Sequence, residues 1–457
     1  MRVSVITDFF QSINDLGSMV VIPIMIAIVG LIFRLNILKA IRAGIMVGIG
    51  LIGLNLILTL IWDYVGPVTT ILVDRFNLNL SVVDAGWPAA AGVAFATKVG
   101  AIIIPFVIVV NLLLLVTKLT KTVNIDIWNY WHYAFTGAIV MTFTGSYVYG
   151  LTAAAAHCII SLKMADISAR RVQSELGLPG ISIPQGFAIS TVPVYMLLDK
   201  LYDRIPFLKK RKIDSEMINS KLGILGEPLM IGLVLGIIIG IVIGYDFKQT
   251  MELAIAMSAL MLLLPRMVKV IMEGLVPISS AAQKFMEKRF KGSEFFIGLD
   301  SAVLLGHPTT ITVGILLIPI TLVLAMIIPT NTTLPFGDLA ATAFFISMAT
   351  PIHRGDFVRT LLSGTIIMAI VLVIASIFAP IITQTAVETG FAFPDGASEI
   401  TALSAGNFVA LIISKLMELK IFGLIIVAAI VGAVIYVSNL FMKKQAVAPT
   451  NDDSEVQ

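Results

Sequence analysis

The sequence has few charged residues. Only 13% of its 457 residues are Asp, Glu, Lys or Arg, 58% are hydrophobic, and the mean hydropathy is +0.99. Soluble domains carry about 25% charged residues. The surplus apolar surface is therefore expected to face lipid, which excludes an ordinary soluble protein. The net charge of +3 is small and dispersed, so nucleic acid is a poor candidate partner.

Several motifs are also absent. The single cysteine, Cys158, excludes an internal disulfide framework and any CxxC metal site. The four histidines lack HExxH or HxH spacing, so we expect no metal and no other cofactor. No Walker motif, Arg-rich voltage sensor or TVGYG-like filter occurs, which argues against an ATP-driven motor and a gated cation channel. No catalytic triad spacing is present, so the chain is not expected to be an enzyme on its own.

Long apolar runs fill most of the chain, and crossing a bilayer takes about 20 such residues per helix. The runs are too long and too uniformly apolar for an outer-membrane barrel. The sequence therefore predicts an all-α polytopic membrane protein with about 10–12 transmembrane or re-entrant segments, over residues 1–441. A short, polar, disordered tail is expected at 442–457. The runs lie near 17–33, 43–62, 98–116, 134–160, 181–198, 222–244, 250–268, 302–328, 336–350, 358–383 and 405–441, the last as one or two pieces.

Basic residues predict the orientation, because they are enriched in cytoplasmic loops. Basic clusters lie at 34–42, 209–212, 284–291 and 443–444, whereas the connections 63–86, 245–249, 329–337 and 384–402 are acidic or neutral. The N-terminus is then expected outside and the C-terminus in the cytoplasm. The loop 161–178, with Arg170 and Arg171, fits this alternation least well.

A weak internal echo relates the two halves. Gly86-Trp87-Pro88 precedes Ile-Ile-Pro-Phe at 103–106, and Gly306-His307-Pro308 precedes Leu-Ile-Pro-Ile at 317–320. An internal repeat would suit a transporter, whereas chance matching in a biased sequence would give the same echo. The number of helices between Gly306 and His353 does not mirror the first half, and a re-entrant segment near 336–350 would restore the match.

Two ionisable residues lie in the apolar segment 295–328. Asp300 and His307 are seven residues apart, so an α-helix would place them on one face. Ionisable residues in hydrocarbon cost at least a few kcal/mol and usually face a cavity. They are candidates to bind a polyhydroxylated solute, although Asp300 would also suit a helix start at the membrane surface. Thr309 and Thr310 either donate to the same solute or satisfy backbone groups freed at Pro308.

Two further polar residues interrupt apolar runs. Glu227 precedes Pro228, where its carboxylate would bind a hydroxylated ligand or cap the following helix. Gln185 lies between Pro184 and Gly186. Its amide can both donate and accept hydrogen bonds, which suits a neutral polyol.

Trp87 and His353 complete the candidate set. Trp87 would stack on a sugar-like face or anchor at the membrane interface. His353 lies in a polar stretch with Arg354 and Asp356, which reads as a cytoplasmic turn, where these two charges pair, or as part of the translocation path.

Two other features are interpreted as structural. The aromatic run 128–133, which includes His132, follows basic residues and is typical of an interfacial belt. His157 and Cys158, in an Ala-rich segment, are expected to be packing residues.

Several motifs together resemble the galactitol-type IIC component of the bacterial phosphotransferase system, in the ascorbate–galactitol superfamily. The resemblance spans about residues 5–440. It rests on Ala85–Gly92 (AGWPAAAG), Ile125–Gly137 (IDIWNYWHYAFTG), Gly226-Glu227-Pro228, Gly298-Leu299-Asp300 with Gly306-His307-Pro308, and Pro351–Gly355 (PIHRG).

The resemblance implies a homodimeric permease of the bacterial inner membrane that takes up galactitol or a related alditol. A separate IIB protein then phosphorylates the polyol from a phosphocysteine, and IIA supplies the phosphoryl group to IIB. In related ascorbate permeases an Asp in a context like Asp300 and a Gln in a position like Gln185 hold the substrate, and a core domain moves like an elevator against a scaffold. The segment 136–138 lacks the His that those permeases carry nearby, which favours a neutral polyol over ascorbate.

The predicted substrate contacts are Asp300, His307, Glu227, Gln185, Thr309, Trp87 and His353. The basic loops 199–221 and 284–294 would dock an acidic partner protein. Two alternatives stay open at this point. One is a secondary transporter that couples its solute to H⁺ or Na⁺ through Glu227 and Asp300, and the other is a structural membrane protein without a solute.

Overall fold

The computed structural model describes residues 18–76, 82–126, 128–209, 228–289, 295–335, 337–390 and 399–447. Helices dominate these residues, which confirms the prediction of an all-α polytopic membrane protein. In the described part of the chain four helices are long and apolar enough to cross a bilayer. They are α7 (Tyr147–Leu176), α13 (Pro308–Ile327), α16 (Phe357–Glu388) and α18 (Ile421–Val447).

A fifth candidate span is broken in the middle. Helix α4 (Gly86–Ala96) and the segment formed by η1 (Gly100–Ile102) and α5 (Ile103–Val116) meet at an angle of 84°. The final apolar run also breaks, into α17 (Phe408–Met417) and α18, at the charged residues where the sequence predicted an interruption. The predicted boundary at residue 441 lies inside α18, and the last ten residues of the tail lie outside the described residues.

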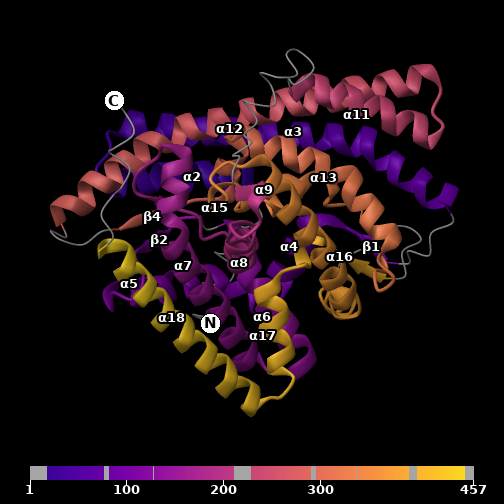
Figure 1. Ribbon diagram of the computed structural model, residues 1–457. Coiled ribbons are helices and arrows are strands. Elements are labelled where there is room, and N and C mark those ends of the chain that lie inside the picture. The colour runs from indigo at the N-terminus through magenta and orange to yellow at the C-terminus, as the bar shows by residue number, and fades with distance from the viewer. Residues whose placement is uncertain are drawn as a thin grey trace.

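Four helices form a layer along one side of the molecule, namely α2 (Ser18–Ile32), α3 (Ile37–Phe76), α11 (Pro228–Ile243) and α12 (Phe247–Arg289) (Figure 1). Close backbone approach joins them: a Cβ added at Gly236 of α11 would collide with the backbone of Ala254 in α12. Glycine removes that obstacle. The broken segments lie on one side of this layer.

The described residues include six very short strands that were not predicted. They are β1 (Val82–Asp84), β2 (Thr122–Asn124), β3 (Ile181–Ser182), β4 (Phe296–Gly298), β5 (Thr333–Leu334) and β6 (Glu399–Thr401). They form two parallel sheets, in the orders β5-β1-β6 and β2-β4-β3. Within an apolar region every backbone N–H and C=O must be paired, so extended chain between helices pairs with other extended chain.

The strand order shows an inverted internal repeat. In the first half, β1 joins one sheet and β2 and β3 join the other. In the second half, β4 joins the sheet of β2 and β3, whereas β5 and β6 join the sheet of β1. The central strands of the two sheets are therefore β1 and β4. Pro105 lies as far beyond Val82 as Pro319 lies beyond Phe296, so the proline echo belongs to the repeat. The Gly86–Gly306 match does not, because Gly86 corresponds in this register to Asp300.

Two predicted apolar runs are short broken pieces. Residues 337–352 form η6 (Leu339–Ala341), α14 (Thr342–Phe345) and α15 (Ala349–Ile352), consistent with the expected re-entrant segment. Residues 181–202 form β3, an extended stretch, η3 (Ala188–Thr191) and α8 (Val192–Tyr202) rather than one helix.

The interfacial-belt interpretation of 128–133 is wrong for the residues whose burial the structure describes. Tyr130, Trp131 and Tyr133, in η2 (Trp128–Tyr130) and α6 (Trp131–Thr144), are at most 2% exposed. The segment packs between the broken span and α7, so its rings fill the core instead of facing the headgroups.

Candidate functional site

Three polar residues gather where the strands of the β2-β4-β3 sheet end. The register pairs Asn124 with Gly298 and Ser182 with Gly298. Parallel strands end at the same edge of a sheet. Asp126, two residues beyond β2, and Asp300, two residues beyond β4, therefore lie side by side at that edge. Gln185 lies three residues beyond the end of the third strand, β3. The structure thus brings two predicted residues, Asp300 and Gln185, to one edge and adds Asp126.

Asn129 joins the two carboxylates. Its Nδ2 donates to Oδ2 of Asp126 and to Oδ2 of Asp300, each at 2.7 Å. Asp300 also caps η5 (Ser301–Gly306), because its Oδ1 accepts from the amide of Ala302 at 2.8 Å. Both aspartate residues are half-buried.

The pKa values of both carboxyl groups, which lie in connections outside the spanning helices, are raised. Burial raises the pKa of Asp300 above its ordinary value. Burial raises the pKa of Asp126 well above its ordinary value, and the neighbouring charge of Asp300 raises it further. We therefore expect Asp300 to be the member of the pair that ionises more readily.

Two histidines that the sequence reasoning set aside support Gln185. The Nε2 atoms of Gln185 and His132 are 2.8 Å apart, and His157 donates from Nε2 to the carbonyl of Gly186 at 3.2 Å. His132 is 3% exposed. It lies one turn before Thr136, whose hydroxyl donates to the carbonyl of His132 at 3.2 Å. A His at the start of an apolar run is the signal that would have found it.

The second sheet has a carboxylate pair of its own. Asp84 and Asp338 are 1% and 0% exposed. Asp84 accepts from the amides of Gly86, Leu403 and Asp338, and Asp338 accepts from those of Trp87 and Ser404, at 2.6–3.2 Å. These oxygens are committed to five backbone N–H groups, so this pair holds broken segments together and the half-buried pair is the better binding site.

The two sheet edges face each other. Asn407, which caps α17 beyond β6, donates from Nδ2 to the carbonyl of Gly186, beside Gln185, at 3.0 Å. Figure 1 accordingly shows β2 and β4 on one side of the core and β1 on the other. Trp87 lies just beyond β1, where its backbone amide donates to Asp338. Its half-buried side chain packs against buried hydrophobic residues of the core. Such facing broken segments are typical of transporter binding sites.

His307 and Thr309 have protein partners. The segment between Asp300 and His307 is the 3₁₀ helix η5, so they do not share an α-helical face. His307 accepts the amide of Thr309 at Nδ1 and lies 3.0 Å from Glu175 through Nε2. The hydroxyl of Thr309 donates to the carbonyl of Gly355 at 3.0 Å. Thr309 thus binds a backbone carbonyl, although not one freed at Pro308, and its contact with a solute stays a prediction.

His353 belongs to a separate charged cluster. Its Nδ1 lies 3.1 Å from Asp199 Oδ1 and its Nε2 lies 2.8 Å from Ser363 Oγ. Asp356 caps α16 by accepting the amide of Arg359. Glu227 lies outside the described residues, as do residues 210–221 and 290–294 of the two basic loops.

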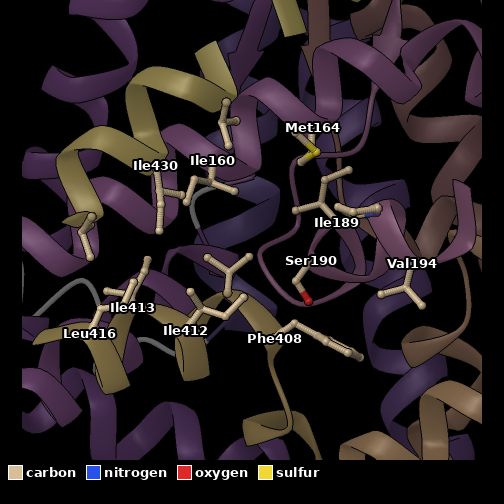
Figure 2. Close-up of a pocket in the computed structure, with 14 residues that line it drawn as sticks. Ile160, Met164, Ile189, Ser190, Val194, Phe408, Ile412, Ile413, Leu416 and Ile430 are labelled. Carbon is tan, nitrogen blue, oxygen red and sulfur yellow. The ribbon is translucent and has the colours of Figure 1, made fainter. Parts of the chain in front are cut away.

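An apolar cavity of about 230 Å³ lies between α7, η3–α8, α17 and α18 (Figure 2). Ile160, Met164, Phe408 and Ile412 line it. The hydroxyl of Ser190 donates to the carbonyl of Phe187, so it is already satisfied. A polyol needs several hydrogen-bonding partners, and this cavity does not supply them.

Spanning helices, an inverted repeat and a polar site between broken segments define a membrane transport protein. Comparison with known proteins narrows the class: residues 12–396 match the family model described as "PTS system sugar-specific permease component". The chain belongs to this family of phosphotransferase-system permeases, and it is a transport subunit that crosses the membrane several times.

Two relatives from Escherichia coli K12 extend the comparison. A protein described as "Putative permease IIC component" is 50% identical over 436 residues, which cover 95% of this chain and 99% of the relative. A "PTS system galactitol-specific EIIC component" is 38% identical over 447 residues, covering 95% and 96%.

Proposed function

We propose that this permease carries galactitol or a related alditol across the bacterial inner membrane, and that a separate IIB protein phosphorylates the alditol. The observation that carries this proposal is the Asp126–Asn129–Asp300 group beside Gln185. Carboxylates accept hydroxyl protons and amides donate to hydroxyl oxygens, so the group matches a run of neighbouring hydroxyls. The charge of Asp300 would repel an anionic sugar, which favours a neutral solute.

Uptake measurements test this function. Cells that express the permease with its IIA and IIB partners should accumulate phosphorylated galactitol, and an uncoupler should leave the initial rate unchanged. Uptake that survives loss of the partners but stops with the uncoupler would favour the ion-coupled alternative. If the purified protein binds no alditol by calorimetry, the proposed substrate class is wrong.

Asn129 provides a direct test of the site. Asn129→Ala removes the donor that bridges both carboxylates. We expect the KM for galactitol uptake to rise about tenfold with a smaller change in maximal rate, because a hydrogen bond to a charged group contributes about 1.5–3 kcal/mol. Gln249→Ala, an exposed amide near the start of α12, is the matched control. Equal KM values for Asn129→Ala and wild type would remove Asn129 from the site.

The layer α2–α3–α11–α12 is the candidate scaffold, and the broken segments are the candidate moving core. We further propose that the protein is a homodimer, that the core moves like an elevator, and that the N-terminus lies outside and the C-terminus inside. The length of α3 and α12 (40 and 43 residues) and their mutual packing support a rigid layer against which the core could slide.

A further inference from the structure

A cluster of cations surrounds Asp199 in α8, away from the Asp126–Asp300 group. Asp199 Oδ1 contacts His353 at 3.1 Å and Arg359 at 3.0 Å, and Arg359 also binds Asp203 at 2.8 Å. Arg171 and Arg354 approach the other oxygen, Oδ2, at 3.5 and 3.7 Å. One carboxylate therefore faces three guanidinium groups and an imidazole.

Arg171 and Arg354 are the accessible members of this cluster. Their side chains are 30% and 60% exposed, whereas Arg359 is 8% exposed. Their distances to Asp199 exceed the 2.7–2.9 Å of a strong charge-assisted hydrogen bond. Arg171 also donates from Nη1 to the carbonyl of Ile352 at 2.9 Å. The remaining donors of these two guanidinium groups suit the oxygens of a phosphoryl group.

The backbone at Arg354 is strained. Its φ is +55°, in the left-handed region that favours glycine, and Gly355 follows at +73°. A non-glycine residue there carries a steric cost that glycine avoids. Residues held in such conformations cluster at functional sites. The carbonyl of Gly355 accepts from Thr309, and Glu175 with His307 packs beside Gly355, so the turn is fixed from both sides.

The cluster lies at the entrance to a basic loop. Arg359 donates to the carbonyl of Leu208, in α9 (Pro206–Lys209), at 2.9 Å. This segment opens the loop 199–221, which the distribution of basic residues predicts to be cytoplasmic. A cytoplasmic phosphorylated partner would reach the cluster from that side.

We infer that Arg171 and Arg354 bind the phosphoryl group of the incoming phosphorylated IIB partner. The inference rests on the proposed function, because it assumes that such a partner docks. The site recognises the phosphorylated form, so wild-type permease should bind phosphocysteine-carrying IIB at least about tenfold more tightly than the same IIB without phosphate.

The decisive variant is Arg354→Gly. Glycine relieves the left-handed strain, so the melting temperature of the purified protein should stay equal or rise, while the preference for phosphorylated IIB falls below about threefold. Arg171→Gln should lower the preference in the same way, and Arg354→Lys should retain part of it, because a Lys ammonium lacks the planar fork. Lys248→Gln, which removes an exposed charge from the start of α12, should leave the preference unchanged.

The measurement is the affinity of galactitol-type IIB, with and without phosphate, for permease in phosphatidylcholine nanodiscs. Using zwitterionic lipid excludes anionic headgroups as competing ligands. A preference that persists in Arg354→Gly, or a loss of affinity shared equally by both IIB forms, would overturn the inference. If wild-type permease binds neither form of IIB, the proposed function, in which IIB docks on the permease, is wrong. If it binds both forms with equal affinity, only the inference that Arg171 and Arg354 bind the phosphoryl group is refuted.

Discussion

Asp300→Asn is expected to lower alditol uptake by about 10–100-fold while the protein stays folded in the membrane. The change removes the charge that receives the solute hydroxyls, and hydrogen bonds to charged groups contribute about 1.5–3 kcal/mol. The asparagine keeps an oxygen for the amide of Ala302, so the cap of η5 survives. Initial uptake rates of labelled galactitol, normalised to the amount of protein in the membrane, measure the effect.

Asp126→Asn is the matched control. Burial and the charge of Asp300 raise the pKa of Asp126. We therefore expect its carboxyl to be the protonated member of the pair, a form that an amide imitates. Uptake should stay within about threefold of wild type. If both variants lose uptake equally, the assignment of the charge to Asp300 is wrong, and wild-type uptake by a well-expressed Asp300→Asn protein would exclude Asp300 from the site.

The sequence predicted the class of fold well, because apolar length alone decides whether a segment can cross a bilayer. The sequence also predicted the break between α17 and α18, because charged residues interrupt the apolar run there. It indicated the short pieces near 336–350 and the matching prolines of the two halves as well. The strands were not visible. Two or three residues carry no period, and their pairing joins segments that are far apart in the chain.

The candidate site was predictable only in part. Asp300 and Gln185 stood out because each is a polar residue beside a break in an apolar run. Asn129 and His132 were hidden within an aromatic run that suggested a membrane interface, and only the packing of α6 shows that they face inward. Seven-residue spacing linked Asp300 to His307, but the intervening 3₁₀ helix gives each residue different partners.

The buried pair Asp84 and Asp338 should dominate stability rather than transport. Asp84→Ala leaves the amides of Gly86, Leu403 and Asp338 without their acceptor in a fully buried place. Each buried unsatisfied group costs about 1–3 kcal/mol, so three of them cost about 3–9 kcal/mol, enough to remove most folded protein from the membrane. Thermal unfolding in detergent, followed by size-exclusion chromatography, measures the change.

The Asp84→Asn variant tests whether Asp84 is needed as an acceptor for backbone N–H groups or as a negative charge for transport. Its amide oxygen can still accept from two of the three N–H groups, and the repulsion between the two acids disappears, so the melting temperature should fall much less than in Asp84→Ala. Galactitol uptake per folded molecule should match wild type, because the solute does not reach oxygens that five backbone amides already occupy. A stable Asp84→Asn protein without uptake would instead place this second sheet edge in the transport pathway, opposite Asp300.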